Sequence, residues 1–201
     1  MRGEYQPGQY LRRPWGELPP RARRIPYDLD EYPRLEVPET MEQAAVQVSR
    51  VNSFANCVRA TAATVMRMRG YDIYPYATLY SAGASGYQIL EALKMWETPD
   101  GEPVKIIETT AKEWKDILGK MPDGYGIFSF QIANAKQRHV ILWQKIDDEV
   151  AFIDAQLGKK INPEGPQYGV DASAPIILVR LDDTTPVDWR LPDVIQPFGK
   201  I

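Results

Sequence analysis

Residues 139–158 read HVILWQKIDDEVAFIDAQLG and decide how the second half of the chain folds. Two apolar runs, 139–146 and 150–154, flank the turn residues Asp147-Asp148-Glu149, which is the pattern of a β-hairpin. Similar strand patterns occupy residues 105–108, 126–132 and 174–181. The sequence therefore predicts an antiparallel sheet over this half of the chain.

Helix patterns precede the strands. Residues 56–70 read NCVRATAATVMRMRG, with apolar side chains at helical spacing, so a helix is expected from Cys57 to Arg69. Asn56 is a suitable N-cap and Gly70 is the expected C-terminal stop. Further helices are expected at 41–48 with Thr40 as cap, at 87–96, and at 111–118 with Thr110 as cap. This order predicts an α+β fold, with N-terminal helices packed on a C-terminal antiparallel sheet.

Length and composition limit the class of protein. A chain of 201 residues suits one domain, or one domain with an arm. Apolar residues make up 44% and charged residues 25%, as in globular proteins, so a disordered or fibrous chain is excluded. A net charge of −3 argues against a general nucleic-acid binder. No apolar run approaches the roughly 18 residues of a membrane span, and the first residues do not resemble a signal peptide.

Residues 1–39 differ from the rest in composition. They contain seven of the 17 prolines and seven arginines, and they contain no lysine. Proline at this density predicts an extended arm or linker. Five aromatic residues in the same segment suggest that part of it packs on a protein surface, its own or a partner's. We therefore expect an arm over 1–39, a folded domain over 40–185 and a proline-rich tail over 186–201.

The chain has one cysteine, Cys57, and one histidine, His139. A single cysteine excludes an internal disulfide, and zinc sites of Cys and His lack ligands, so no metal is expected. At the first position of a helix, unpaired N–H groups and the helix dipole favour the thiolate form of Cys57. A thiolate is the nucleophile of acyl transfer, although a lone free cysteine is most often a small buried hydrophobic residue.

The hairpin places polar residues on one face. With the turn centred on residues 147–148, His139 lies opposite Gln156, and Asp154 lies two residues before Gln156 on the same side. In this register Asp154 can orient the imidazole and stabilise its charged form, as the third member of a catalytic triad does. A slip of one residue would move Asp154 to the opposite face of the sheet.

Two sequence blocks resemble papain-fold toxin domains of the glutamine deamidase type. The first, at 56–72, is an Asn-Cys pair followed by an alanine-rich helix that ends in Met-Arg-Gly-Tyr-Asp. The second is His139 with three apolar residues, a short turn, and Ile-Asp-Ala-Gln-Leu-Gly at 153–158. The resemblance covers roughly residues 50–160. Many members carry a second cysteine early in the helix, where this chain has Thr61, and that position is not the nucleophile.

The resemblance implies a reduced papain-like (cysteine protease-like) fold and a protein-glutamine deamidase, which converts glutamine to glutamate and releases ammonia. In this interpretation Cys57 is the nucleophile, His139 carries the proton, and Asp154 orients His139. The oxyanion and the substrate amide need hydrogen-bond partners, for which the candidates are the Cys57 backbone N–H, Gln156, Asn56 and Asn52. No cofactor is required.

Such domains occur in polymorphic toxins and are appended to phage minor head proteins. The resemblance thus implies a toxin or effector module delivered into the cytoplasm of a target or host cell, or a virion-associated protein. The expected partner is a protein substrate with a target glutamine, while an immunity protein or a virion protein would bind the N-terminal arm; neither nucleic acid nor a membrane is expected. The same residues also suit a cysteine peptidase, an isopeptidase or an acyltransferase, and the fold alone would suit a non-catalytic virion component.

Overall fold

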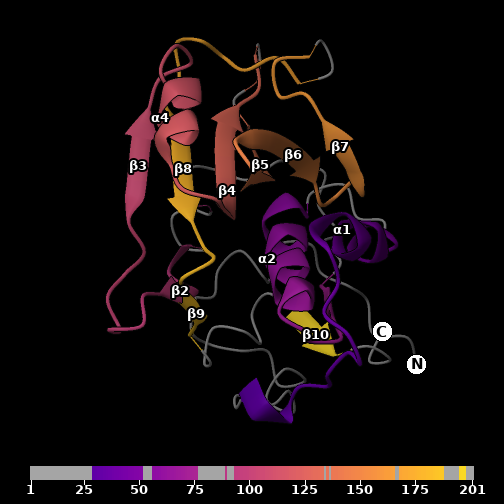
Figure 1. Cartoon of the computed structure of the whole chain (residues 1–201). Helices are drawn as coiled ribbons and strands as arrows, with labels where there is room; N and C mark the ends of the chain where they lie inside the picture. The colour runs from indigo at the N-terminus through magenta and orange to yellow at the C-terminus, as the bar shows by residue number, and fades with distance from the viewer. Residues whose placement is uncertain are drawn as a thin grey trace, which may run out of the picture.

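A six-stranded antiparallel sheet forms the centre of the protein (Figure 1). The computed structural model describes residues 29–51, 56–76, 89, 93–133, 135, 137–165, 168–187 and 195–197. The strands follow one another across the sheet in the order β3 (Ile106–Thr109), β8 (Ile176–Arg180), β4 (Gly124–Gln131), β5 (Arg138–Ile146), β6 (Glu149–Asp154) and β7 (Lys159–Ile161). The expected α+β class, with N-terminal helices against an antiparallel sheet, is confirmed.

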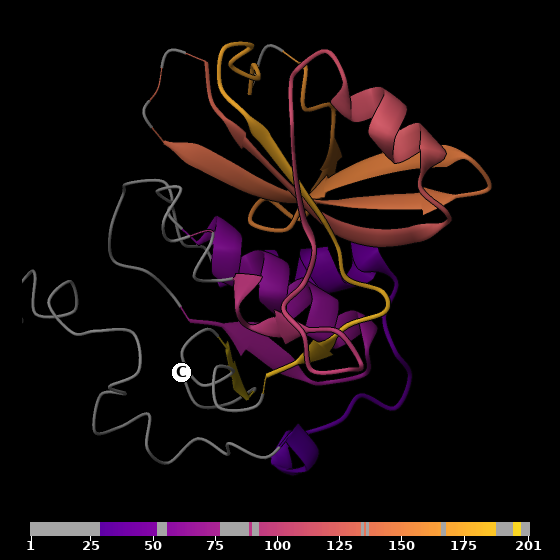
Figure 2. The same ribbon diagram turned by 90° about the vertical axis from the view of Figure 1, so that its left-hand side faces the viewer.

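Helices cover both faces of this sheet (Figure 2). Helices α1 (Met41–Ser49) and α2 (Cys57–Met68) lie on one face, and α4 (Trp114–Lys120) lies on the other. Because side chains alternate along a strand, the strands β4, β5, β6 and β8 each supply both cores. The core below α2 contains Ile127, Val140, Leu142, Ile153, Ile177 and Val179, and the core below α4 contains Phe128, Phe130, Ile141, Trp143, Phe152, Ile176 and Leu178.

Two short ladders lie beyond the helices. Strand β1 (Ile73–Pro75) pairs with β10 (Ile195–Pro197), and β2 (Trp96–Glu97) pairs with β9 (Thr185–Pro186). A 3-10 helix, η2 (Leu29–Glu31), precedes α1 in the chain. Two parts of the expected tail, Pro186 and strand β10, therefore pair with strands that lie about 90 to 120 residues earlier in the chain.

The ends of the first two helices follow the sequence closely. Thr40 caps α1 in a capping box, in which its side chain accepts a hydrogen bond from the backbone of Gln43 and the Gln43 side chain bonds back. Helix α2 begins at Cys57, as expected, and Gly70 follows its end with a φ of +88°. A left-handed φ is typical of the residue that terminates a helix, and glycine adopts it without a Cβ penalty.

Other predicted bounds of helices and strands are wrong, or lie partly outside the residues that the structure describes. Trp96 belongs to strand β2 and not to a helix over 87–96, because it pairs with Pro186; most of that range lies outside the described residues. Helix α4 begins at Trp114 rather than at 111, because the chain first makes a turn at Thr110, and it continues past the expected end at Leu118 to Lys120. The short strand β7, which pairs with β6, was not expected from the pattern.

The C-terminal end of α2 is buried, although three arginines, Arg59, Arg67 and Arg69, predict a solvated face on this helix from the sequence alone. The segment at 33–39 and strand β1 cover it, and Arg67 is 3% exposed. Its guanidinium donates two 2.7 Å hydrogen bonds to the Glu39 carboxylate and one to Asp72. Hydrogen bonds to these carboxylates outweigh desolvation and raise the pKa of Arg67. This ion pair fastens the segment before α1 to α2.

We expect Arg67→Ala to lower the free energy of unfolding by about 2–4 kcal/mol, because the change leaves Glu39 and Asp72 without their partner. This is somewhat less than the roughly 3–5 kcal/mol lost when a fully buried ion pair is broken, because the Glu39 and Asp72 side chains keep some contact with water. Urea denaturation measures the effect. Lys160→Ala is the matched control, since Lys160 pairs with Glu42 on the surface and its loss should cost about 0–1 kcal/mol. Equal losses in both variants would contradict the assignment.

Candidate active site

Cys57 is the first residue of α2, at the end of the helix that points toward the start of β5. The preceding residue, Asn56, closes the first turn by accepting a backbone hydrogen bond from Ala60. The Cys57 side chain is 2% exposed and belongs to the core between α2 and the sheet. Burial alone would fit a structural cysteine, so the neighbours of the thiol decide what it can do.

His139 and Asp154 lie on neighbouring strands in the register expected from the sequence. The pairs Leu142–Ile153 and Lys145–Val150 fix the alignment of β5 with β6, and Asp147 and Asp148 form the turn with positive φ angles. The His139 Nε2 lies 2.8 Å from the Asp154 Oδ2. Since a carboxylate only accepts, Nε2 carries the proton of this bond, and Nδ1 is the ring nitrogen that remains for the Cys57 side chain.

Four hydrogen bonds satisfy the Asp154 carboxylate, which is fully buried. Oδ2 accepts from the His139 ring and, at 2.5 Å, from the Tyr168 hydroxyl. Oδ1 accepts from the backbone N–H groups of Gln156 at 2.9 Å and Leu157 at 3.1 Å. Burial favours the protonated acid, but the hydrogen bond and charge of His139, with the other donors, lower the pKa of Asp154 below its usual value. Asp154 therefore stays ionised at neutral pH.

The imidazole lies between two partners from different layers of the fold. Burial disfavours its charged form, but hydrogen bonds to the side chains of Asp154 and Cys57, and the charge of both, raise the pKa of His139 to about 9. His139 is therefore a cation at neutral pH. Because the Cys57 side chain hydrogen-bonds the imidazole, the structure brings together the only thiol and the only imidazole of the chain, with Asp154 on the far side of the ring.

Tyr168 and Phe130 enclose the ring of His139. Tyr168 stacks on it with ring centroids 5.3 Å apart and an interplanar angle of 11°, while Phe130 meets it edge-on at 5.8 Å. Sequence reasoning missed both residues. Tyr168 follows β7 in a loop, and no spacing rule relates a loop residue to a strand fourteen or more residues earlier, so only the folded chain brings it to Asp154.

The turn after β6 explains the Ile-Asp-x-Gln-x-Gly block. Gly158 donates its N–H to the Asp154 carbonyl at 2.8 Å, so the chain leaves the ladder at Asp154. The predicted pairing of Gln156 opposite His139 is therefore wrong. Gly158 has a φ of +65°, and a Cβ there would lie 2.9 Å from the Cβ of Ser49 in α1. Only glycine therefore fits where this turn, which holds Asp154, packs on α1.

The predicted oxyanion and amide residues have different outcomes. Gln156 contributes its backbone N–H to Asp154, and its side chain is partly exposed. Asn56 occupies the N-cap position, but its side chain makes no capping bond; it is 3% exposed, and its Oδ1 has no hydrogen-bond partner among the described residues. Asn52 lies outside the described residues.

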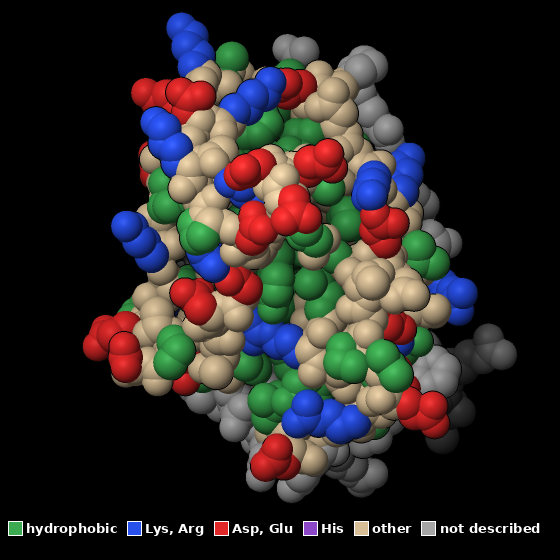
Figure 3. Space-filling model, in the orientation of Figure 1, with side chains coloured by type: hydrophobic (Ala, Val, Ile, Leu, Met, Phe, Trp, Pro, Cys, Tyr) green, Lys and Arg blue, Asp and Glu red, His purple; other side chains and the backbone are tan. Residues whose placement is uncertain are grey.

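The site is largely closed in this structure. Figure 3 shows charged side chains of both signs and no histidine on the face presented in Figure 1, and the His139 side chain is 12% exposed. In the described part of the chain, no group of three or more His, Cys, Asp or Glu side chains is arranged to hold a metal ion. Among the helices of the same residues, none has the length and apolar character needed to cross a membrane.

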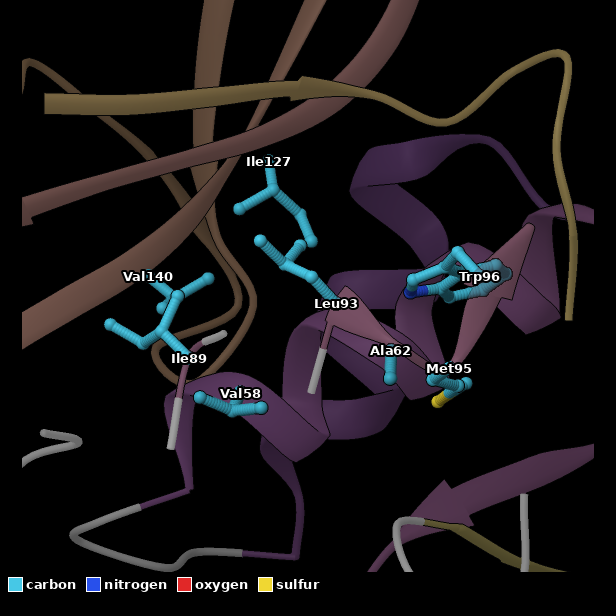
Figure 4. Close-up of a pocket in the computed structure, with 8 residues that line it drawn as sticks. All are labelled: Val58, Ala62, Ile89, Leu93, Met95, Trp96, Ile127 and Val140. Atoms are coloured by element: carbon cyan, nitrogen blue, oxygen red, sulfur yellow. The ribbon is translucent and has the colours of Figure 1, made fainter. Parts of the chain in front are cut away.

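A small apolar cavity lies beside the site, between α2 and strands β4 and β5 (Figure 4). Its lining consists of Val58, Ala62, Ile89, Leu93, Met95, Trp96, Ile127 and Val140. None of these side chains is charged or nucleophilic, so the cavity supplies no group for acid–base or covalent chemistry.

Comparisons of the chain with models of protein families, with curated proteins and with solved structures find no match. No relative therefore suggests a function, and the geometry of the site is the structural observation from which one can be proposed.

Asp154→Asn is expected to lower the pKa of His139 from about 9 by one unit or more, because the imidazolium loses its negative partner. The only histidine gives an unambiguous NMR titration. A histidine pKa raised on folding stabilises the native state fully below the unfolded value of about 6.5 and loses this effect as the pH rises through 9. The stability advantage of the wild type over Asp154→Asn should therefore shrink as the pH rises toward 9 and be largely lost above it. Asp148→Asn, an exposed turn variant, should leave the titration unchanged; an unchanged pKa in Asp154→Asn would contradict the pairing.

Proposed function

We propose that this protein is a thiol-dependent acyl-transfer enzyme, and specifically a protein-glutamine deamidase. The observation that carries the proposal is the His139 imidazole, which lies between the Cys57 side chain at a helix N-terminus and the ionised Asp154 carboxylate. This is the nucleophile, base and orienting acid of a catalytic triad. The resemblance of the two sequence blocks to papain-fold toxin domains supports glutamine as the substrate and a reduced papain-like fold.

The reaction begins from a pair in which His139 already holds the proton of the Cys57 thiol, so the sulfur is a thiolate and the ring an imidazolium. The Cys57 sulfur attacks the side-chain amide carbon of a glutamine, and a carbon–sulfur bond forms as the carbonyl oxygen becomes an oxyanion. The carbon–nitrogen bond then breaks, and the imidazolium gives its proton to the leaving nitrogen, which departs as ammonia. A water molecule, deprotonated by the now neutral His139, attacks the thioester. The carbon–sulfur bond breaks, the new carboxylic acid loses its proton to solvent and is released as glutamate, and the thiolate–imidazolium pair is restored.

The electrostatics of the site support this cycle. A His139 pKa of about 9 means that the ring is an imidazolium at neutral pH, where it stabilises a neighbouring thiolate and can protonate the leaving amide nitrogen, which departs as ammonia. The hydrogen bond to Asp154 holds one proton on Nε2 and fixes the orientation of the ring. Nδ1 is therefore the nitrogen that exchanges protons with the sulfur and the leaving group. The enclosure of the ring by Phe130 and Tyr168 keeps bulk water away from the His–Asp bond.

Donors for the oxyanion come from the start of α2. The first N–H groups of a helix have no intrahelical acceptor, so the Cys57 backbone N–H is the first donor in this proposal. The side chains of Gln156 and Asn56 are the candidates for the second donor or for holding the substrate amide. Asn56 is the stronger candidate for holding the substrate amide, because it precedes the nucleophile and its buried Oδ1, which has no protein partner among the described residues, can accept a hydrogen bond from the substrate N–H.

The biological setting rests on the resemblance alone. Papain-fold domains of this kind are delivered as toxin or effector modules or are attached to phage head proteins, and a proline-rich arm suits such an attachment. In this proposal the substrate is a cytoplasmic protein of the target or host cell. A peptidase, isopeptidase or acyltransferase would use the same three residues, so the product must separate these activities.

An activated thiol is tested by alkylation with iodoacetamide between pH 5 and pH 10. We expect the rate constant at pH 6.5 to be at least about one third of the plateau at pH 10 for the wild type, because His139 supports the thiolate. In His139→Gln this ratio should fall to ~0.01, the ionised fraction of an ordinary thiol of pKa ~8.5. Because each ratio compares two rate constants of the same protein, differences between the proteins in access to the buried sulfur cancel. Equal ratios in both proteins would rule out an activated pair.

The reaction itself is tested on protein extracts incubated with wild type or Cys57→Ser. Deamidation predicts ammonia release and glutamine-containing peptides about one dalton heavier, in chains of unchanged length, with the wild type only. Shortened chains would identify a peptidase, and conjugates with added hydroxylamine in place of glutamate would identify an acyltransferase. Identical extracts from both proteins would favour the non-catalytic component.

A further inference from the structure

We propose that Tyr168 is a positioning residue of the site, which holds the Asp154 carboxylate through its hydroxyl and the His139 imidazole through its ring. This inference rests on the proposed roles of Cys57, His139 and Asp154. Tyr168 itself touches neither the sulfur nor the reacting atoms in the proposed cycle, so it acts through its two neighbours. Tyr168 lies in the loop after β7, so a third part of the chain, besides β5 and β6, contacts the pair of His139 and Asp154.

The hydroxyl contact fixes the acid. Tyr168 donates to Asp154 Oδ2 at 2.5 Å, and His139 Nε2 bonds the same oxygen at 2.8 Å. The other oxygen is held by two backbone N–H groups of the following turn. With both oxygens engaged from opposite sides, the carboxylate cannot rotate about its bond to Cβ without losing hydrogen bonds in a buried site.

The ring contact fixes the base. The tyrosine ring lies nearly parallel to the imidazole, at an interplanar angle of 11°, and covers one face of it, while Phe130 meets the ring at 83°. Rotation of the imidazole about its bond to Cβ would drive it into these aromatic rings. The stack therefore keeps Nε2 on Asp154 and leaves Nδ1 toward the thiol, which is the arrangement that proton exchange with sulfur requires.

The hydroxyl of Tyr168 also affects the charge of His139. The groups that face the imidazole are Asp154 on β6, Cys57 on α2, Tyr168 in the loop and the uncharged Phe130 on β4. Burial and the hydrogen bond to Asp154 raise the pKa of Tyr168 well above its usual value, so its hydroxyl remains a donor at working pH. Because it competes with His139 for one carboxylate oxygen, the hydroxyl weakens the hold of Asp154 on the imidazolium proton.

Two substitutions separate the hydroxyl contact of Tyr168 from its ring contact. Tyr168→Phe keeps the stack and removes the hydroxyl, so the pKa of His139 should rise, by ~0.5–1 unit. The alkylation ratio between pH 6.5 and pH 10 should stay within about twofold of the wild type. Tyr168→Leu removes both contacts, and the ratio should fall about tenfold or more, toward that of His139→Gln. Tyr125→Phe is the matched control, because it removes a partly buried hydroxyl that bonds Arg69 away from the site, and it should change neither quantity.

The titration of the only histidine and the alkylation of the only cysteine are read without any substrate. The proposal is overturned if Tyr168→Phe leaves the pKa of His139 unchanged or lowers it, or if Tyr168→Leu keeps the alkylation ratio of the wild type. A merely structural role would lower the melting temperature of both variants while leaving the titration in place. If Tyr168→Leu does not fold, Tyr168→Phe and its titration still decide the matter. Failure to find deamidation would remove the proposed reaction but not these results.

Discussion

The buried carboxylate of Asp154 is the constraint around which the rest of the site is arranged. An ionised acid without exposure to water costs several kcal/mol unless its oxygens are hydrogen-bonded and its charge is paired. Four donors meet that requirement, and they come from three parts of the chain: the strand β5, the turn after β6, and the loop that contains Tyr168. The need to satisfy one charge therefore holds three segments in fixed relative positions.

The sheet and the helices contribute different things to the site. The β5–β6 ladder sets the distance between His139 and Asp154, because its register fixes which residues are neighbours. Helix α2 brings the thiol to the end of this ladder, and its position depends on the core that it shares with Val140 and Leu142. Gly158 joins the two parts, since the turn that satisfies Asp154 also packs against α1. A small change in the packing of α1 or α2 would thus alter the relation between sulfur and imidazole.

Away from the site, buried charge serves the packing of the helix layer. Arg67 at the far end of α2 pairs with Glu39 and Asp72, and so ties the segment before α1 and the segment before β1 to the same helix. One end of α2 carries the nucleophile of the proposed reaction and the other carries this ion pair. The helix is therefore held at both ends by polar interactions and along its length by apolar ones, which suits a helix that must place one atom accurately.

Much of this could be predicted from sequence where the signal is local. The periodicity of 139–158 and the turn at Asp147-Asp148 determined the hairpin and its register, and with it the meeting of His139 and Asp154. The Asn56–Gly70 pattern determined the helix with Cys57 at its start. The tertiary structure alone decided that Tyr168 and Phe130 enclose the imidazole, that Arg67 is buried, and that Gln156 uses its backbone rather than its side chain toward Asp154. Turn and helix signals act over a few residues, whereas these contacts depend on how distant segments pack around one core, and no period in the sequence records that packing.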